Sequence, residues 1–221
     1  MRESLVIGLP PFLINLCACF VAITVTRSMT QYGGDTAVGA FGIINRLSLF
    51  VVMVVIGLNQ GMQPIAGYNF GAQKYDRLLR VLRLAVIAAT IITTTGFAVG
   101  FFFAGPCVSI FAKDAPELVR EATRGLRLTV LLFPLIGMQI VSTAFFQSIG
   151  YAGKSIFLSL TRQLLFLLPL LLLLPRFFDD KVLGVWLAMP ISDALASVFS
   201  AVMLLVYIRK FKRAAATGAL V

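Results

Sequence analysis

Six long apolar runs constrain the fold of this chain more than any other feature of its sequence. They cover roughly residues 5–29, 37–66, 84–104, 125–148, 156–175 and 183–207. A helix needs about 20 apolar residues to cross the hydrocarbon core of a bilayer. Backbone polar groups in lipid must be hydrogen-bonded within the protein, and these runs lack the alternation of a β-barrel, so each run predicts a membrane-spanning helix. We therefore expect an all-α, polytopic membrane protein.

The composition agrees with a membrane protein and disfavours an enzyme. Hydrophobic residues make up 59% of the 221 residues, charged residues only 13%, and the mean hydropathy is +0.96. A soluble domain carries about 25% charged residues, and a domain of this size could not bury so much apolar surface. Histidine is absent, and Cys17, Cys19 and Cys107 lie in or beside apolar runs, where we expect packing residues. No catalytic residues, metal or cofactor are therefore predicted.

The distribution of Lys and Arg predicts the orientation in the membrane. If the N-terminus is cytoplasmic, eleven of these residues fall on the cytoplasmic side and seven on the other, while Arg46 lies inside the second run. Cytoplasmic loops carry the excess of basic residues, so both termini are expected in the cytoplasm, at the cell (inner or plasma) membrane. The basic tail 208–221, expected to fray at its end, and the net charge of +10 predict attraction to anionic membrane lipid. Nucleic acid is not an expected partner, because the charges are scattered over loops.

The second apolar run carries an amide-rich stripe. On a helix, Asn45, Asn59, Gln60 and Gln63 fall within about 100° of arc. Polar groups facing lipid are costly, so this face should look into protein or water, and Pro64 predicts a kink. The stripe either lines a substrate cavity or hydrogen-bonds neighbouring helices.

The fourth run repeats this pattern. Gln139, Thr143 and Gln147 follow one another at intervals of four residues, after Pro134. Pro169 predicts a kink in the fifth run. Two broken helices with polar stripes predict a transport cavity near the middle of the membrane.

Few ionisable residues lie deep inside the apolar runs. Arg46 in the second run and Asp193 in the sixth are at similar depth, so a neutralising ion pair is one interpretation. In the alternative, Arg46 extends toward the outer surface and Asp193 caps a break after Pro190.

The connection "AKDAPELVREA" at 112–122 predicts a short surface helix. Asp114 is an expected N-cap with Glu117 three residues later, and Pro116 suits the first turn. Its charged side chains are expected to be solvated.

Four motifs resemble those of a known family. "NQGMQPIAGYNFGA" (59–72) is similar to the eighth helix and following loop of MATE multidrug efflux transporters, and later segments of that family resemble, in order, "FQSIGYAGKS" (146–155), "SLTRQLLFLLP" (159–169) and "GVWLAMPISD" (184–193). The resemblance implies a Na+- or H+-coupled antiporter that exports small cationic, amphipathic drugs. It also implies a twelve-helix fold in two lobes, of which residues 1–221 form the second six-helix lobe. The motif positions expected to be structural are Pro64, Gly67, Asn69, Gly71 and Arg162.

The resemblance also indicates what this chain lacks. Some relatives bind the coupling ion through acidic residues in their seventh and tenth helices, but residues 4–29 contain no acid and Gln139 is the polar centre of 125–148. The coupling site is therefore expected in the first lobe. This leaves three hypotheses: a lobe that needs the first lobe as its partner, a half-transporter that pairs with a second copy of itself, and a flippase for lipid-linked sugars. The flippase would want more cationic residues in its cavity, and a non-transporting scaffold remains a fourth alternative.

Overall fold

The computed structural model describes the backbone of residues 2–113 and 115–217, and the side chains of Phe12, 15–113 and 115–215. This part of the chain is helical and contains no strand. Its elements are α1 (Arg2–Gly71), α2 (Tyr75–Phe102), α3 (Ala104–Ser109), α4 (Pro116–Val130), α5 (Phe133–Ser148), α6 (Ala152–Leu160), the π-helix η1 (Thr161–Leu167), α7 (Leu168–Phe177) and α8 (Lys181–Thr217). The predicted all-α class is confirmed.

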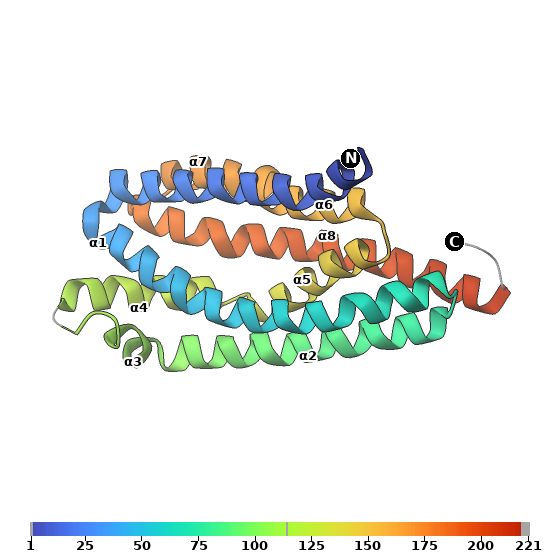
Figure 1. The fold of residues 1–221 in the computed structure, drawn as a ribbon. Coiled ribbons are helices and arrows are strands. Elements are labelled where there is room, and N and C mark those ends of the chain that lie inside the picture. The colour runs from blue at the N-terminus through green and yellow to red at the C-terminus, as the bar shows by residue number, and fades with distance from the viewer. Residues whose placement is uncertain (1, 114, 218–221) are drawn as a thin grey trace.

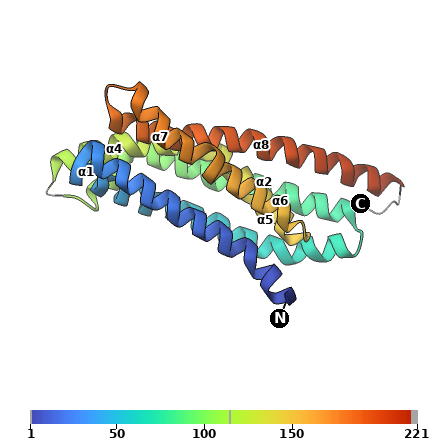
Figure 2. The ribbon, with the colours of Figure 1, turned by 90° about the horizontal axis from the view of Figure 1, so that it is seen from above.

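The helices run side by side along one long axis (Figure 1). Seen from above, α6 and α7 lie between the first arm of α1 and α8 (Figure 2). We call the two ends of this bundle the Gly34 end, with the turn in α1 and the start of α4, and the Lys74 end, with the α1–α2 turn and the end of α8 (Figure 1).

Helix α1 contains the first two predicted spans, joined at Gly34. Gly34 has φ 64° and ψ −158°, a backbone conformation that is essentially restricted to glycine. The chain reverses there, so α1 is two arms of a helical hairpin (Figure 1). In the described chain, four helices are long and apolar enough to cross a membrane, and the bent pair α4 and α5 makes a fifth. With the arms of α1 counted separately, there are six crossings, as the sequence predicts.

The fourth crossing begins earlier than predicted. The expected surface helix at 112–122 is instead the start of α4, which continues to Val130 and meets α5 at a bend of 56°. Pro116 occupies the first turn of α4, as expected, whereas Asp114 lies outside the described residues. Glu121 is not simply solvated, because its carboxylate Oε1 accepts a hydrogen bond from Trp186 Nε1 at 3.0 Å. This bond ties α4 to α8.

The fifth and sixth crossings also differ in detail from the prediction. The irregularity expected at Pro169 takes the form of η1, which ends just before that proline. Proline cannot donate to the carbonyl four residues earlier, and its ring crowds that carbonyl; the wider π-helical turn relieves this conflict. Helix α8 continues through Pro190 and on through the expected tail to Thr217. Phe211, within that tail, is fully buried.

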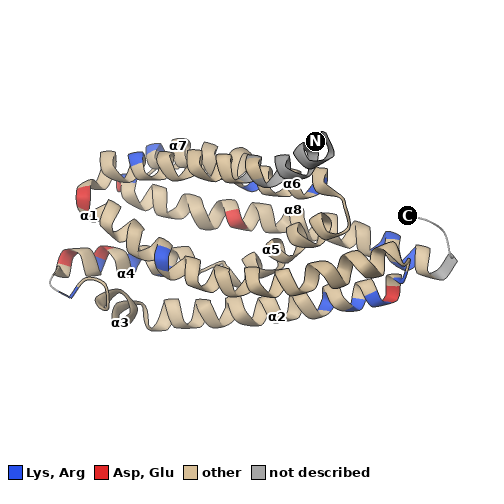
Figure 3. Cartoon of the chain, in the orientation of Figure 1, with Lys and Arg blue, Asp and Glu red and all other residues tan. Residues whose placement is uncertain are grey.

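Two clusters of buried side chains hold the bundle together. The cluster toward the Gly34 end surrounds Trp186, and the cluster toward the Lys74 end contains Phe145, Phe146 and Phe211. Large apolar side chains such as Phe50 and Phe102 are 77% and 70% exposed, as expected of surfaces that contact lipid. Charged residues gather near the ends of the bundle and are sparse between them (Figure 3).

Candidate functional site

A polar cavity lies between the two arms of α1, the α4–α5 bend, η1 and α8. Its volume is about 350 Å³. Most of its wall is apolar, with Val25, Phe41 and Ile44 among the lining residues. The polar side chains in its lining are Asn45, Ser48, Thr129, Arg162, Gln163, Ser192 and Asp193. Such a cavity, apolar with a few polar groups, is typical of a small-molecule site.

An ion pair joins η1 to α8 at this cavity. Arg162 Nε donates to Asp193 Oδ1 at 2.6 Å. The Asp193 side chain is only 6% exposed and that of Arg162 is 34% exposed. Removing either partner would leave a charge in a poorly hydrated place, so the pair is strongly coupled. A charge-assisted hydrogen bond therefore joins η1 to α8 at one side of the cavity.

This ion pair corrects the predicted partner of Asp193. The sequence suggested Arg46, but Arg46 lies on an exposed face of the second arm of α1, and Asp193 pairs with Arg162. The alternative, a cap on a break after Pro190, is also wrong, because α8 is continuous there. The sequence marked Arg162 only as a structural motif position, and the charge count placed it on the cytoplasmic side rather than inside the membrane. Helix α6 begins at Ala152, so Arg162 stands ten residues inside the fifth crossing.

Two buried oxygen atoms at the cavity have no hydrogen-bond partner within the described residues. They are Gln163 Oε1 in η1 and Ser48 Oγ in α1. Leaving such a group unsatisfied costs about 1–3 kcal/mol, so each is positioned to bind water or a ligand group. Pi-helical turns occur frequently at functional sites. The π-helix and the unpartnered oxygen of Gln163 thus lie in the same part of the cavity wall.

The predicted amide stripes separate into different environments. Asn45 lines the cavity. Gln139 is buried, and its Oε1 accepts from Ser197 Oγ at 3.5 Å, while Thr143 Oγ1 donates to the backbone oxygen of Gln139 at 3.1 Å. These two residues of the fourth crossing therefore make structural hydrogen bonds, Gln139 across to α8 and Thr143 within α5.

The other predicted cavity residues do not line this cavity. Asn59 is buried, and its Oδ1 has no partner in the described chain. Gln63 is half-buried, and Gln60 and Gln147 are exposed. A role for these four in a substrate path stays a prediction.

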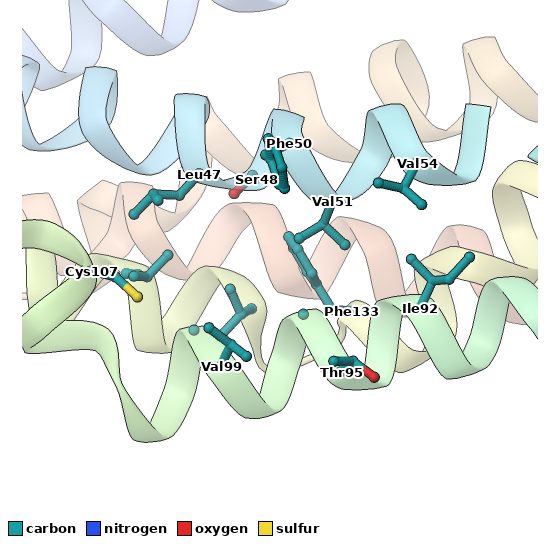
Figure 4. Close-up of a pocket in the computed structure, with 14 residues that line it drawn as sticks. Leu47, Ser48, Phe50, Val51, Val54, Ile92, Thr95, Val99, Cys107 and Phe133 are labelled. Carbon is teal, nitrogen blue, oxygen red and sulfur yellow. The ribbon is translucent and has the colours of Figure 1, made fainter. Parts of the chain in front are cut away.

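A second, almost wholly apolar pocket of about 290 Å³ lies between the second arm of α1, α2 and the α4–α5 bend. Figure 4 shows Val51 and Phe133 projecting into it, with Val99 on the opposite side. Thr95 Oγ1 donates to the backbone oxygen of Ile91 at 2.9 Å, so it offers little polar recognition. The pocket suits an apolar group or an acyl chain.

With this geometry established, comparison with known proteins identifies the family. The family model MatE matches residues 10–173. The chain belongs to the MatE family. The resemblance to MATE transporters and the fold class inferred from it are thereby confirmed.

Related proteins extend this MatE assignment over the whole chain. The multidrug export protein MepA of Staphylococcus aureus (strain MSSA476) is 26% identical over 221 residues, which are 100% of this chain and 47% of MepA. MepA of Staphylococcus haemolyticus (strain JCSC1435) is 26% identical over 178 residues, covering 80% of this chain and 38% of that protein. The chain thus spans about half the length of the curated relatives it matches.

Solved MATE structures show the same fold. The MATE multidrug transporter DinF-BH matches with a TM-score of 0.80 and 36% identity over 92% of this chain and 45% of its own. A MATE structure in the bent conformation matches with a TM-score of 0.88 at 20% identity, over 95% of this chain and 46% of its own. Both overlap one half of a longer chain.

The MatE sequence motif at 59–72 forms the junction between α1, α2 and α5. A Cβ at Gly67 would lie 3.0 Å from the backbone oxygen of Ser148, so the two helices approach closely there. Asn69 Nδ2 donates to the backbone oxygen of Ile65 at 2.8 Å, and the backbone oxygen of Asn69 accepts from the backbone N–H of Lys74 at 2.9 Å. These contacts terminate α1 and support the structural role expected for the motif.

The remaining motif positions are consistent with this junction. Gly71 is the last residue of α1. Pro64 keeps helical backbone torsion angles, since Gly34 is the non-helical residue inside α1. The residue with non-helical torsion angles inside α1 is thus Gly34, which precedes the amide stripe, and the kink expected at Pro64 stays a prediction.

Proposed function

We propose that this chain forms one six-helix lobe of a secondary antiporter that exports small cationic, amphipathic compounds across the cell membrane. The observation that carries the proposal is the match of the entire chain to half of the multidrug export protein MepA. The cavity at η1 supports it, because apolar walls and polar groups together suit an amphipathic molecule.

The partner of this lobe is a first lobe of the same transporter or, as the alternative, a second copy of the chain. Twelve helices then enclose a path between the lobes, with both termini in the cytoplasm. Na+ or H+ is the coupling ion. Where the partner is a distinct first lobe, the ion binds in that lobe, because the intramembrane carboxylate of Asp193 in this lobe is already paired with Arg162.

Alternating access requires helices that change shape or tilt. The 56° bend between α4 and α5 and the π-helix η1 supply two irregular points beside the cavity. Their position supports a function in which this lobe opens and closes one side of the path.

Ethidium retention in efflux-deficient cells tests the proposal. The chain is expressed alone, its insertion into the membrane is verified, and the H+ and Na+ gradients are collapsed separately. Retention that falls, and recovers when one gradient is collapsed, supports transport by two copies and identifies the ion. Unchanged retention with good insertion counts against the two-copy arrangement and favours a distinct first lobe.

Binding provides the test that is independent of the partner. Fluorescence anisotropy of ethidium titrated with the purified protein should show saturable binding. A second lipophilic cation should displace the bound ethidium. A linear, non-saturable titration would contradict a substrate site in this lobe.

A further inference from the structure

A third cavity lies at the Lys74 end, between the first half of α2 and the last half of α8. Its volume is about 760 Å³. Four charged side chains line it: Asp76, Arg80, Arg83 and Lys212. The rest of its lining is apolar, with side chains contributed by both helices. We call this cavity the α2–α8 cleft.

The cations of the α2–α8 cleft are available to a ligand. Arg80, Arg83 and Lys212 are all exposed. Within the described residues, the ion pairs join Arg124 to Asp180 and Arg162 to Asp193, so none of the three is neutralised by an ion pair. Arg80 and Arg83 are three residues apart on one face of α2, where like charges repel. One carboxylate, Asp76, opposes three cations, so the cleft carries an excess of positive charge.

The apolar lining of the cleft continues from these cations into the membrane-spanning part of the bundle. Val86 and Ile87 follow Arg83 along α2, and Leu204 precedes Ile208 and Lys212 along α8. Ile87 is 46% exposed, whereas Leu204 is 5% exposed and forms part of the floor. From Arg80 to Ile87 the helix rises by about 10 Å. The cleft thus has a cationic rim and an apolar groove that is long enough for several methylene groups of an acyl chain.

We propose that the α2–α8 cleft is a binding site for one anionic phospholipid. The lipid phosphate lies against Arg80, Arg83 and Lys212, and an acyl chain follows the apolar side chains of α2 and α8 toward the bilayer interior. A soluble phosphate would leave this apolar groove without an occupant, and a zwitterionic lipid would bring a further positive charge to a rim that already carries three. The site does not depend on the transported compound, and it differs from general attraction by the net charge because it requires particular cations.

Native mass spectrometry of the purified protein in detergent tests the site. Phosphatidylglycerol and phosphatidylcholine with the same acyl chains are added in equal amounts, and bound lipid is counted. We expect preferential retention of one phosphatidylglycerol. Since each basic residue near a membrane surface contributes about a fivefold change in binding, the triple variant Arg80→Gln, Arg83→Gln, Lys212→Gln should weaken retention at least about tenfold.

A second triple variant serves as the matched control. Arg77, Arg209 and Lys210 are exposed on the same two helices but do not line the cleft. Replacing these three with Gln removes the same charge and should leave retention of phosphatidylglycerol nearly unchanged. Equal losses in the two triple variants would overturn the proposal, as would equal retention of the two lipids by the unmodified protein.

Two further measurements keep the test decisive if a triple variant is poorly folded. Asp76→Asn removes the opposing charge and should strengthen phosphatidylglycerol retention; weaker retention contradicts the site. Glycerol 3-phosphate should not displace the lipid. Displacement by this soluble anion would show that the cleft recognises phosphate alone and would refute a lipid site.

Discussion

Arg162 and Asp193 form an ion pair at 2.6 Å that joins the π-helix η1 to the long helix α8 within the membrane. Each side chain neutralises the charge of the other in a poorly hydrated part of the bundle. The pair therefore has consequences for stability that can be measured separately from transport.

Replacing one residue of the pair should lower the free energy of unfolding more than replacing both residues. Asp193→Leu should lower the free energy of unfolding by about 3 kcal/mol, because it leaves an unpaired guanidinium in the bundle. The double variant Arg162→Met, Asp193→Leu should lose less than the sum of the two single variants. Unfolding in mixed micelles of detergent and dodecyl sulfate measures all three; additive losses would contradict the coupling.

Exchanging charges distinguishes the observed partner from the predicted one. The exchange Arg162→Asp, Asp193→Arg should keep more stability than either of its single changes. The corresponding exchange between Arg46 and Asp193 should give no such recovery, since Arg46 is on an exposed face. Recovery by the Arg46 exchange would mean that Arg46 is the true partner of Asp193.

Gly34 should not tolerate a side chain. With φ 64° and ψ −158°, Gly34→Ala should cost about 1–3 kcal/mol, because the backbone conformation strains any residue with a Cβ. Gly42 is the control: it lies within the second arm, and a Cβ there meets no atom within 4 Å. Gly42→Ala should be neutral or stabilise by up to about 1 kcal/mol. Thermal unfolding in detergent measures both, and equal midpoints would argue against the turn at Gly34.

Lys154 should stabilise the α5–α6 turn through two aromatic rings. Its Nζ lies 3.7 Å from the ring centroid of Tyr151 and 3.9 Å from that of Tyr207. Lys154→Met keeps the length of the side chain but loses the charge, and should cost about 1 kcal/mol. Lys154→Arg should retain most of the stability. If the Lys154→Met and Lys154→Arg variants both unfold at the same midpoint as the unmodified protein, the cation–π contacts contribute nothing.

The two interpretations of the amide stripes predict different effects. Asn45 lines the cavity and Gln139 bonds to Ser197. Asn45→Leu should therefore weaken ethidium binding several-fold with little loss of stability, whereas Gln139→Leu should mainly lower stability, by about 1 kcal/mol. Anisotropy titration and thermal unfolding of the same preparations check both. Reversed effects would place the substrate path along α5.

The sequence predicted the parts of the fold that depend on hydropathy and backbone chemistry. The six crossings follow from the lengths of the apolar runs, and the irregularity near Pro169 follows from its missing N–H. The start of the fourth crossing was misplaced because α4 begins with charged and polar residues such as Glu117 and Arg120, which hydropathy assigns to a surface. A helix can extend from an apolar run into polar sequence without a change in its backbone.

The site was only partly predictable, because it depends on contacts between distant segments. Asn45 and Asp193 were recognised as polar groups within apolar runs, but the partner of Asp193 is 31 residues away in another helix. The fifth apolar run, 156–175, contains Arg162 near its start, but Arg162 was counted with the basic residues of the cytoplasmic side instead of as an intramembrane charge. Gln163 gave no signal of its own, because the burial of its side-chain oxygen depends on how distant segments pack around η1.

The π-helix also determines the rotational phase of α7. A π-turn holds more residues than an α-turn, so side chains after Leu167 face directions that they would not have if α6 continued as a regular helix. Rewinding η1 into an α-helix would rotate Arg162 relative to α7 and so change its contact with Asp193. Helix geometry and charge neutralisation are thus linked in one segment. A rotation of α7 about its axis would change the ion pair that Arg162 makes with Asp193 of α8.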